Sequence, residues 1–187
     1  SVKEAEQFFS PSLRDLHDPF LMPQMDLAVA RLNRAMGSKQ RIMVYGDYDV
    51  DGTTAVSLVY KYLLNYYSNI DYYIPTRYDE GYGISRRVID EFHQQGVKLV
   101  IILDCGIKAI EEIKYAASLG IDFIICDHHV PDDELPPAVA ILNPKLIGSN
   151  YPYPHLSGCG VGFKLMQAFA KDNGIEFSQL IPLLDLV

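Results

Sequence analysis

Cysteine and long hydrophobic runs are both scarce in this sequence, and each scarcity excludes a class of protein. The 187 residues contain three cysteines, Cys105, Cys126 and Cys159, and no CxxC pair. This pattern argues against a disulfide framework and against a thiolate zinc site, and it favours a reducing, cytoplasmic location. The longest apolar runs end within about eight residues, whereas a membrane-spanning helix needs roughly 20. We therefore expect a soluble protein with no membrane partner.

Positive charge is also scarce. Lys and Arg number 16 against 24 Asp and Glu, which gives a formal net charge of −8. Non-specific binding to a polyanion normally depends on many Lys and Arg residues that displace counterions. A phosphate-containing substrate must therefore be met locally, by metal ions or by a few well-placed cations. The candidates for such cations are Arg77, Arg86, Arg87, Lys145 and Lys164.

Short apolar segments alternate with helical patterns along the middle of the chain. The apolar segments, rich in β-branched and aromatic residues, are residues 41–45, 70–74, 97–103, 121–126 and 138–142. Helical periodicity is found between them, over residues 53–67, 85–95 and 107–119, and Gly96 and Gly120 follow two of these helices as C-caps should. The alternation predicts an α/β fold: a Rossmann-like, mostly parallel sheet with helices on both faces.

The two flanks of this unit have a helical character. Residues 1–40 are expected to form an N-terminal helical arm, with an amphipathic helix over residues 23–36 capped by Gly37. After the last strand, a Pro- and Gly-rich loop leads to a C-terminal helical segment, with helices over residues 161–172 and from about residue 177. The chain starts without Met and stops in the apolar run IPLLDLV, so we expect a fragment of a longer protein.

Polar residues follow every expected strand at the point where the strand ends. The carboxyl ends of parallel strands meet at one edge of a sheet, where open α/β proteins bind their ligands. These residues are therefore expected to lie close together: Asp47, Asp49 and Asp51 after the first strand, Thr76 and Arg77 after the second, Asp104 after the third, Asp127, His128 and His129 after the fourth, and Asn143 and Lys145 after the fifth.

The stretch YGDYDVDGTTA, residues 45–55, allows three interpretations. It begins like a calcium-binding EF-hand loop, but Leu58 stands where that loop needs a bidentate Glu, and a strand rather than a helix precedes it. A plain polar turn is the second interpretation, although three neighbouring acids would repel one another without a compensating cation. The third interpretation, a catalytic metal site, fits best.

Two further motifs support the metal site. The LDCGI motif at residues 103–107 would be weak alone, because an Asp before a Gly turn is often only a helix cap. The CDHHV motif at residues 126–130 supplies a carboxylate and two imidazoles, although two loop histidines can also lack any role. Together the acids and histidines form an oxygen-rich set that suits Mn²⁺ or Mg²⁺ better than Zn²⁺, and the surplus of carboxylates suits two ions.

Two candidate phosphate-binding features remain. In SGCGVGFKL, residues 157–165, a glycine-rich turn enters a helix, and the N–H groups near Ser157 and Gly158 could hold a phosphate. A tight turn for close helix packing explains the same pattern equally well. Arg77 has a planar guanidinium suited to a terminal phosphate, although an exposed Arg at such a position is often only a solvated charge.

The motifs GDYDVDGTTA, LDCGI and DHH resemble the first three motifs of the DHH phosphoesterase superfamily. The segments EGYG, NPK and LSGCGVGFKL resemble its RecJ branch of single-strand-specific 5′ to 3′ DNA exonucleases. The resemblance implies two Mn²⁺ or Mg²⁺ ions held by four ligands: Asp49, Asp51, Asp104 as the bridging ligand, and His128.

The resemblance also implies roles for residues around these ligands. His129 would contact the scissile phosphate or protonate the leaving group, and Asp127 would orient His128. Asp47 is counted with these two among the catalytic residues. Arg77 would hold the 5′ phosphate, with Ser157 and Gly158 as further phosphate contacts.

The sequence departs from the family pattern in two places. Tyr45 stands where many members of the superfamily have a metal-binding His, and the Asp of the fourth family motif is expected beyond Val187 rather than at Asp185. We therefore expect residues 41–187 to be a DHH catalytic domain truncated at its C-terminus, without the second catalytic domain or a nucleic-acid-binding module. Such a fragment alone is expected to be weakly active or inactive.

The expected function is a metal-dependent phosphodiesterase that degrades single-stranded DNA from a 5′ phosphate end, in recombination and repair. Another DHH phosphoesterase is the alternative: an oligoribonuclease, a cyclic-dinucleotide phosphodiesterase or a manganese pyrophosphatase. A non-catalytic binding domain is a third interpretation, which the cluster of mutually repelling acids opposes.

Overall fold

The computed structural model describes residues 8–10, 12–76 and 83–187. Its elements, in chain order, are η1 (Leu13–Asp15), η2 (Pro19–Leu21), α2 (Met25–Gly37), β1 (Arg41–Gly46), α3 (Val50–Leu64), β2 (Ile70–Tyr73), α4 (Arg86–Gln94), β3 (Val97–Leu103), α5 (Ile110–Ser118), β4 (Asp122–Cys126), β5 (Ala140–Leu142), α6 (Gly158–Asp172), η3 (Phe177–Gln179) and η4 (Ile181–Leu186).

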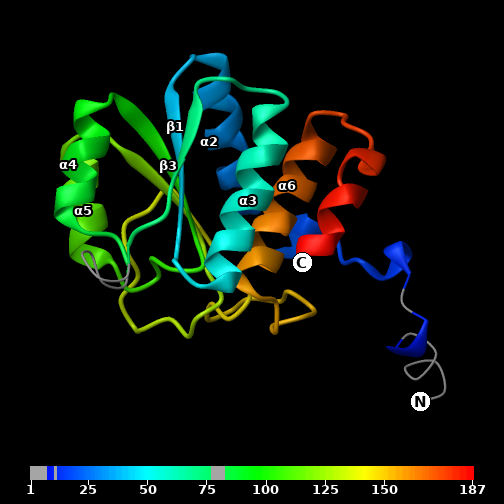
Figure 1. The fold of residues 1–187 in the computed structure, drawn as a ribbon. Helices are drawn as coiled ribbons and strands as arrows, with labels where there is room; N and C mark the ends of the chain where they lie inside the picture. Colours follow the sequence, from blue (N-terminus) through cyan, green and yellow to red (C-terminus); the bar gives the residue numbers. More distant parts are fainter. Residues whose placement is uncertain (1–7, 11, 77–82) are drawn as a thin grey trace.

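The five strands form one parallel sheet in the order β2-β1-β3-β4-β5. Helices α4 and α5 cover one face, and α2, α3 and α6 cover the other (Figure 1). The predicted α/β sheet with helices on both faces is confirmed. Between β1 and β3 the connections turn to opposite sides of the sheet, and such a switch point leaves a crevice at the carboxyl edge.

Each face of the sheet has its own hydrophobic core, because side chains alternate along a strand. In β1, Ile42 and Val44 pack toward α2, α3 and α6, whereas Met43 and Tyr45 pack toward α4 and α5. Strand β3 is buried from Leu99 to Leu103. Burial on both faces explains why the strands are apolar throughout rather than alternating with polar residues.

Helix α2 belongs to the same core as the sheet. Its buried residues include Met25, Ala28 and Leu32, and all three join the cluster that contains Val44 of β1. The side chain of Arg31 donates a hydrogen bond from Nε to Asp122, at 2.6 Å, and so ties α2 to the start of β4. A domain boundary at residue 40 stays a prediction.

Several boundaries differ from the sequence-based ones. Helix α3 begins at Val50 because the side chain of Asp49 caps it, and α6 begins at Gly158 because Ser157 caps it. Gly37 is not a C-cap; it is the last residue of α2, and Lys39 takes the positive φ, 54°. The segment from residue 177 forms two 3₁₀ helices instead of an α-helix. The C-caps predicted at Gly96 and Gly120 have φ of 75° and 71°.

Within the described part of the chain, we find no helix with the length and apolar character that a bilayer crossing demands.

Candidate metal centre

The turn from β1 into α3 carries the first acids of the site. Asp49 is the N-cap of α3, and its Oδ1 accepts a hydrogen bond from the Gly52 N–H at 2.9 Å. A Cβ at Gly52 would lie 2.4 Å from the backbone oxygen of Asp47, which no real Cβ tolerates. The turn therefore requires glycine at this position, and it holds the buried Asp47 and the exposed Asp49 at the carboxyl edge of the sheet. A strand precedes the loop, so the EF-hand interpretation is wrong.

Asp104 directly follows β3 and has an uncommon backbone conformation. Its φ is 61°, in the left-handed region that Asp adopts more readily than most side chains, and its N–H donates to the Cys126 oxygen at 2.9 Å. Only 2% of Asp104 is exposed. Backbone strain of this kind is often found at functional sites.

One oxygen of the Asp104 carboxylate is buried without a hydrogen bond from the described residues. Its buried Oδ1 accepts no hydrogen bond from any described residue, and the Nε2 atom of His128 lies 3.1 Å away without hydrogen-bond geometry. Burial, followed by the nearby charges of Asp51 and Asp49, raises the pKa of Asp104 to about 8. A buried carboxylate oxygen without a hydrogen bond, placed among other acids, is the environment that a bound divalent cation would relieve. The residues therefore fit a metal ion.

Asp127, directly after β4, is fully buried and connects the loops that follow β3 and β4. Its Oδ1 accepts the backbone N–H groups of His128 and His129, at 2.7 and 3.0 Å. Its Oδ2 accepts the N–H of Ile107 at 3.0 Å. The Nδ1 atom of His129 lies 2.7 Å from Oδ1.

That Asp127 orients His128 as a metal ligand stays a prediction, and the described contacts show a different partner for the ring. The carboxylate touches His128 only through its backbone, and it orients the ring of His129 instead. Because an ionised carboxylate only accepts hydrogen bonds, Nδ1 of His129 is the donor, and the neutral ring carries its lone pair on Nε2.

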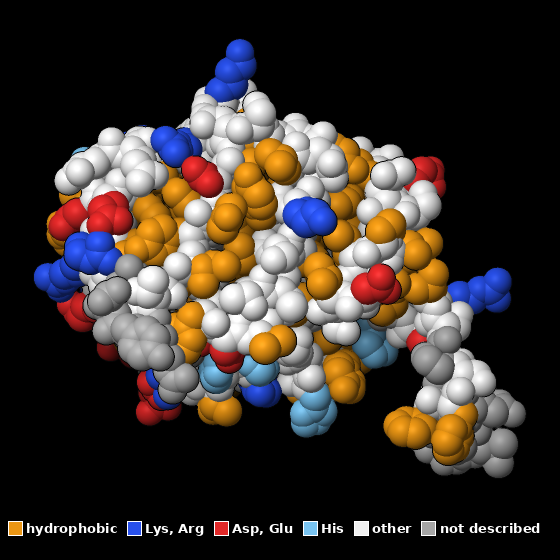
Figure 2. Space-filling view, viewed as in Figure 1, with side chains coloured by type: hydrophobic (Ala, Val, Ile, Leu, Met, Phe, Trp, Pro, Cys, Tyr) orange, Lys and Arg blue, Asp and Glu red, His pale blue; other side chains and the backbone are white. Residues whose placement is uncertain are grey.

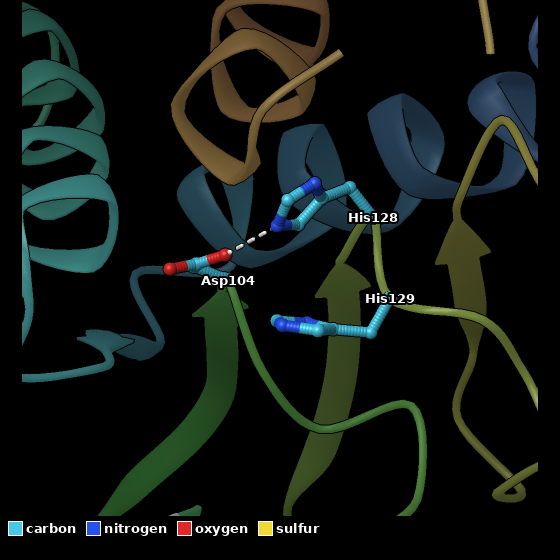
Figure 3. A group of neighbouring side chains, drawn as sticks. All are labelled: Asp104, His128 and His129. Atoms are coloured by element: carbon cyan, nitrogen blue, oxygen red, sulfur yellow. Dashed lines mark ion pairs between the residues drawn. The ribbon is translucent and has the colours of Figure 1, made fainter. Parts of the chain in front are cut away.

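The side chains form two potential ligand groups that share Asp104. One contains Asp47, Asp49 and Asp104, and the other contains Asp104, His128 and His129; within each group the ligand atoms lie within 4.8 Å of one another. Figure 3 shows the two imidazoles reaching from the β4 loop toward Asp104. In the space-filling view, acidic and histidine atoms meet at the lower edge of the molecule, below a broad hydrophobic region (Figure 2).

Asp51 lies between the second group and helix α6. Its Oδ2 is 3.7 Å from Nε2 of His128. Its two carboxylate oxygens also accept the backbone N–H groups of Gly158 and Cys159, each at 2.7 Å. The Oγ of Ser157 accepts the N–H of Gly160 as an N-cap. Phosphate binding by Ser157 and Gly158 stays a prediction, and these groups already have partners within the chain.

Sequence reasoning gave Asp47 and His129 catalytic roles without naming them among the four ligands, and in the structure each belongs to a potential ligand group. Asp47 is 5% exposed, and burial is the main cause that raises its pKa. The regular spacing of Asp47 with Asp49 was the available signal. The buried Asn143 was also missed as a support of the site; its Nδ2 donates to the His129 backbone oxygen at 2.9 Å.

Other residues singled out in the sequence do not join the ligand groups. Cys105 is buried, and burial raises the pKa of its thiol, which makes it a poor metal ligand. The hydroxyl of Tyr45 donates to the Gly83 oxygen at 2.8 Å, on the α4 side of the sheet. Lys164 is 3% exposed, so it is not a surface cation. Arg77 lies outside the described residues.

A cavity of about 570 Å³ opens beside His129. Gly83 and Ile84 line one side, and the loop from Gly106 to Ala109 lines another. Lys108, Glu112 and His129 contribute its polar side chains. The cavity is large enough for a nucleotide-sized ligand next to the acidic cluster.

The chain is similar to single-stranded-DNA-specific RecJ exonucleases. It is 38% identical to the protein of Bacillus subtilis (strain 168) over 100% of this chain and 24% of the relative, and 42% identical to that of Escherichia coli (strain K12) over 87% and 30%. A crystal structure of exonuclease RecJ bound to manganese superposes with a TM-score of 0.79 at 30% identity, covering 88% of this chain and 41% of that one.

The chain thus spans between about a quarter and a third of the length of these curated relatives. Its residues 41–187 match the model of the DHH family, N-terminal domain. This match includes the turn after β1, Asp104 and the two histidines, and the chain belongs to the DHH family.

Proposed function

We propose that this chain carries the catalytic centre of a metal-dependent phosphodiesterase that degrades single-stranded DNA from the 5′ end. Two divalent cations, Mn²⁺ or Mg²⁺, would activate a water molecule and stabilise the charge on the phosphoryl oxygens. The ligands would be Asp49, Asp51, Asp104 and His128, with Asp47 available on the side of Asp49.

The observation that carries this proposal is the position of Asp104. It is the one residue common to the two potential ligand groups, and its Oδ1 is buried without a hydrogen bond from a described residue. A bridging carboxylate needs both properties, because each oxygen must remain available to an ion. The surrounding ligands are oxygens and imidazoles, which suit Mn²⁺ and Mg²⁺.

We assign the proton transfer to His129. The Asp127 carboxylate accepts from its Nδ1, so when the ring is protonated Nε2 carries the proton that passes to the leaving oxygen of the substrate, and the ring becomes neutral. The same carboxylate binds the Ile107 N–H, so the ring is tied to the loop after β3 as well as to its own loop. A catalytic histidine oriented through its second nitrogen by a buried carboxylate is a common arrangement.

Single-stranded DNA as the substrate is supported by the similarity to RecJ proteins and by the cavity next to His129. A terminal nucleotide would fit there, with Lys108 near its phosphates. Recognition of a 5′ phosphate by Arg77 is a sequence-based proposal. We expect Arg77→Ala to reduce the preference for 5′-phosphorylated over 5′-hydroxyl strands, whereas equal loss on both substrates would identify a general contact.

The activity of the 187 residues alone is a separate proposal. The RecJ relatives are more than three times as long, and the net charge of −8 disfavours binding of a polyanion by this part alone. We therefore expect weak degradation by the chain itself. A cytoplasmic location, where DNA and reduced thiols occur, is consistent with its three free cysteines.

The test is a comparison of substrates at equal Mn²⁺ concentration. We expect 5′-phosphorylated single-stranded DNA to be degraded faster than duplex DNA, oligoribonucleotides, cyclic dinucleotides or pyrophosphate, and His129→Ala to reduce the rate by at least about 100-fold. Faster turnover of a cyclic dinucleotide or of pyrophosphate would favour another DHH phosphoesterase. Retention of the full rate in His129→Ala would refute the assigned proton transfer.

A further inference from the structure

Helix α6 begins beside Asp51, and the backbone at its start binds the carboxylate of this residue. The N–H of Gly158 donates to Oδ2 of Asp51, and the N–H of Cys159 donates to Oδ1, each at 2.7 Å. These two N–H groups belong to the first turn of the helix, whose amides have no partner within the helix. Asp51 is therefore held by both oxygens, from an element that lies 107 residues further along the chain.

The same glycine contacts the shared ligand candidate, Asp104. A Cβ on Gly158 would lie 2.4 Å from Oδ1 of Asp104 and 2.5 Å from its Cβ. Only a residue without a side chain lets the start of α6 approach this closely. The atom that it approaches is the buried Oδ1, which no described residue supplies with a hydrogen bond.

We propose that the first turn of α6 positions the metal ligands Asp51 and Asp104, and that Gly158 and Ser157 are positioning residues of the metal centre. This inference rests on the proposed metal-dependent function. It gives Ser157 and Gly158 a role inside the protein, in place of the contact with a substrate phosphate that the glycine-rich pattern predicted. This role corresponds to the interpretation of that pattern as a close-packing turn, with the proposed metal ligands as the packing partner.

The physical effect is preorganisation. An ion binds more tightly when its carboxylate ligands are already oriented, and loss of groups that hold metal ligands typically costs about 10–100-fold in affinity. The positive end of the α6 dipole also offsets part of the negative charge that Asp51 and its neighbours concentrate. Ser157 acts through the helix start, since its Oγ accepts the Gly160 N–H at 3.0 Å.

Mn²⁺ titration by calorimetry on the 187-residue chain tests the inference without any substrate. We expect Gly158→Ala to weaken Mn²⁺ binding at least about 10-fold, because the new methyl group must displace Asp104. Gly160→Ala is the matched control in the same helix turn. Its Cβ would meet the end of the Leu156 side chain at 3.3 Å, a contact that can relax, so Mn²⁺ affinity should stay within about 2-fold of wild type.

Ser157 provides a second variant in case Gly158→Ala does not fold. We expect Ser157→Ala to weaken Mn²⁺ binding about 3–10-fold, and Ser157→Thr to restore it, because Thr is also an N-cap and the exposed position has room for a methyl group. A residue that contacts only substrate phosphate would change the affinity for single-stranded DNA and leave Mn²⁺ binding unchanged.

The outcomes separate the two claims. If wild type binds Mn²⁺ and both Ser157→Ala and a folded Gly158→Ala bind it equally well, the positioning role is refuted while the proposed function stands. If wild type itself binds no Mn²⁺, the proposed metal-dependent function is refuted, and the positioning role with it. Unfolding of each metal-free variant in urea identifies those that are folded.

Discussion

The Nδ1 atom of His129 lies 2.7 Å from Oδ1 of Asp127, a carboxylate with no exposed surface that also accepts three backbone N–H groups. This single side chain fixes the tautomer of His129, the start of the loop after β4 and the Ile107 end of the loop after β3. The loop that carries His128 and His129 is therefore held by a residue that lies in neither potential ligand group.

Replacement of Asp127 by Asn should damage both stability and the metal site. The amide offers one oxygen, so its NH₂ group faces either the Ile107 N–H or the His129 side. A buried donor is then left unpaired, at a cost of about 1–3 kcal/mol in the free energy of unfolding. Urea unfolding measures this loss. Asp133→Asn, at an exposed loop position, is the control and should change stability by less than about 0.5 kcal/mol. Equal stabilities would contradict the role of Asp127.

The turn between β1 and α3 should tolerate no side chain at Gly52. Gly52→Ala would bring a methyl carbon to 2.4 Å from the backbone oxygen of Asp47, so the turn must open, and we expect at least about 2 kcal/mol of lost stability. Gly37→Ala is the matched control, because nothing lies within 4 Å of its Cβ position in α2; it should be neutral or stabilise by up to about 1 kcal/mol. Similar urea midpoints for the two variants would argue against a closed turn.

Much of the fold and the acids of the site could be predicted from the sequence because both depend on local patterns. Apolar strands that end in Asp47, Asp104 and Asp127 bring these side chains to one edge whatever the loops do. Contacts between distant segments have no such local signal. Two examples are the hydrogen bond from the Gly158 N–H to Asp51 and the contact between Asp127 and the His129 ring. Both depend on how distant segments pack in three dimensions.

The burial of Lys164 is another feature that could not be predicted from the sequence. In the sequence Lys164 counts as a cation available to a substrate, but in the structure its Nζ is buried and donates to the His17 oxygen and to Gln167, each at 2.8 Å. Burial lowers the pKa of Lys164 to about 8. Its role is to connect α6 with the segment before α2, and it is not available for phosphate recognition.

This burial makes stability depend on pH in a defined window. Between about pH 8 and pH 10.5 the unfolded chain keeps the Lys164 proton that the folded chain has lost, so the free energy of unfolding should rise with pH relative to Lys164→Met. The full difference corresponds to about 3 kcal/mol. Urea unfolding of both proteins at pH 7.5 and 10 measures it, and the comparison cancels the titration of other groups. A difference that stays constant with pH would show that Lys164 is not desolvated.

In the absence of metal, the titration of Asp104 should make the free energy of unfolding fall as the pH rises, the opposite of the effect of Lys164. Burial and neighbouring acids raise the pKa of Asp104 to about 8, so the folded chain keeps a proton that the unfolded chain loses above pH 4. The free energy of unfolding should therefore fall from pH 4 to pH 8 by at least about 2 kcal/mol relative to Asp104→Asn, which does not titrate. Unfolding in the presence of a chelator tests this. Parallel pH profiles for the two proteins would mean that Asp104 is compensated by another group.

Calorimetric titration of Mn²⁺ into wild type and into Asp104→Ala tests the central claim most directly. If Asp104 bridges two ions, wild type should bind two Mn²⁺ per chain, and the variant should lose at least one of them, with weaker binding of any that remains. Binding should also weaken as the pH falls below about 8, because Asp104 must lose its proton before it can bind an ion. Coincident isotherms for wild type and Asp104→Ala would contradict a metal centre built around Asp104.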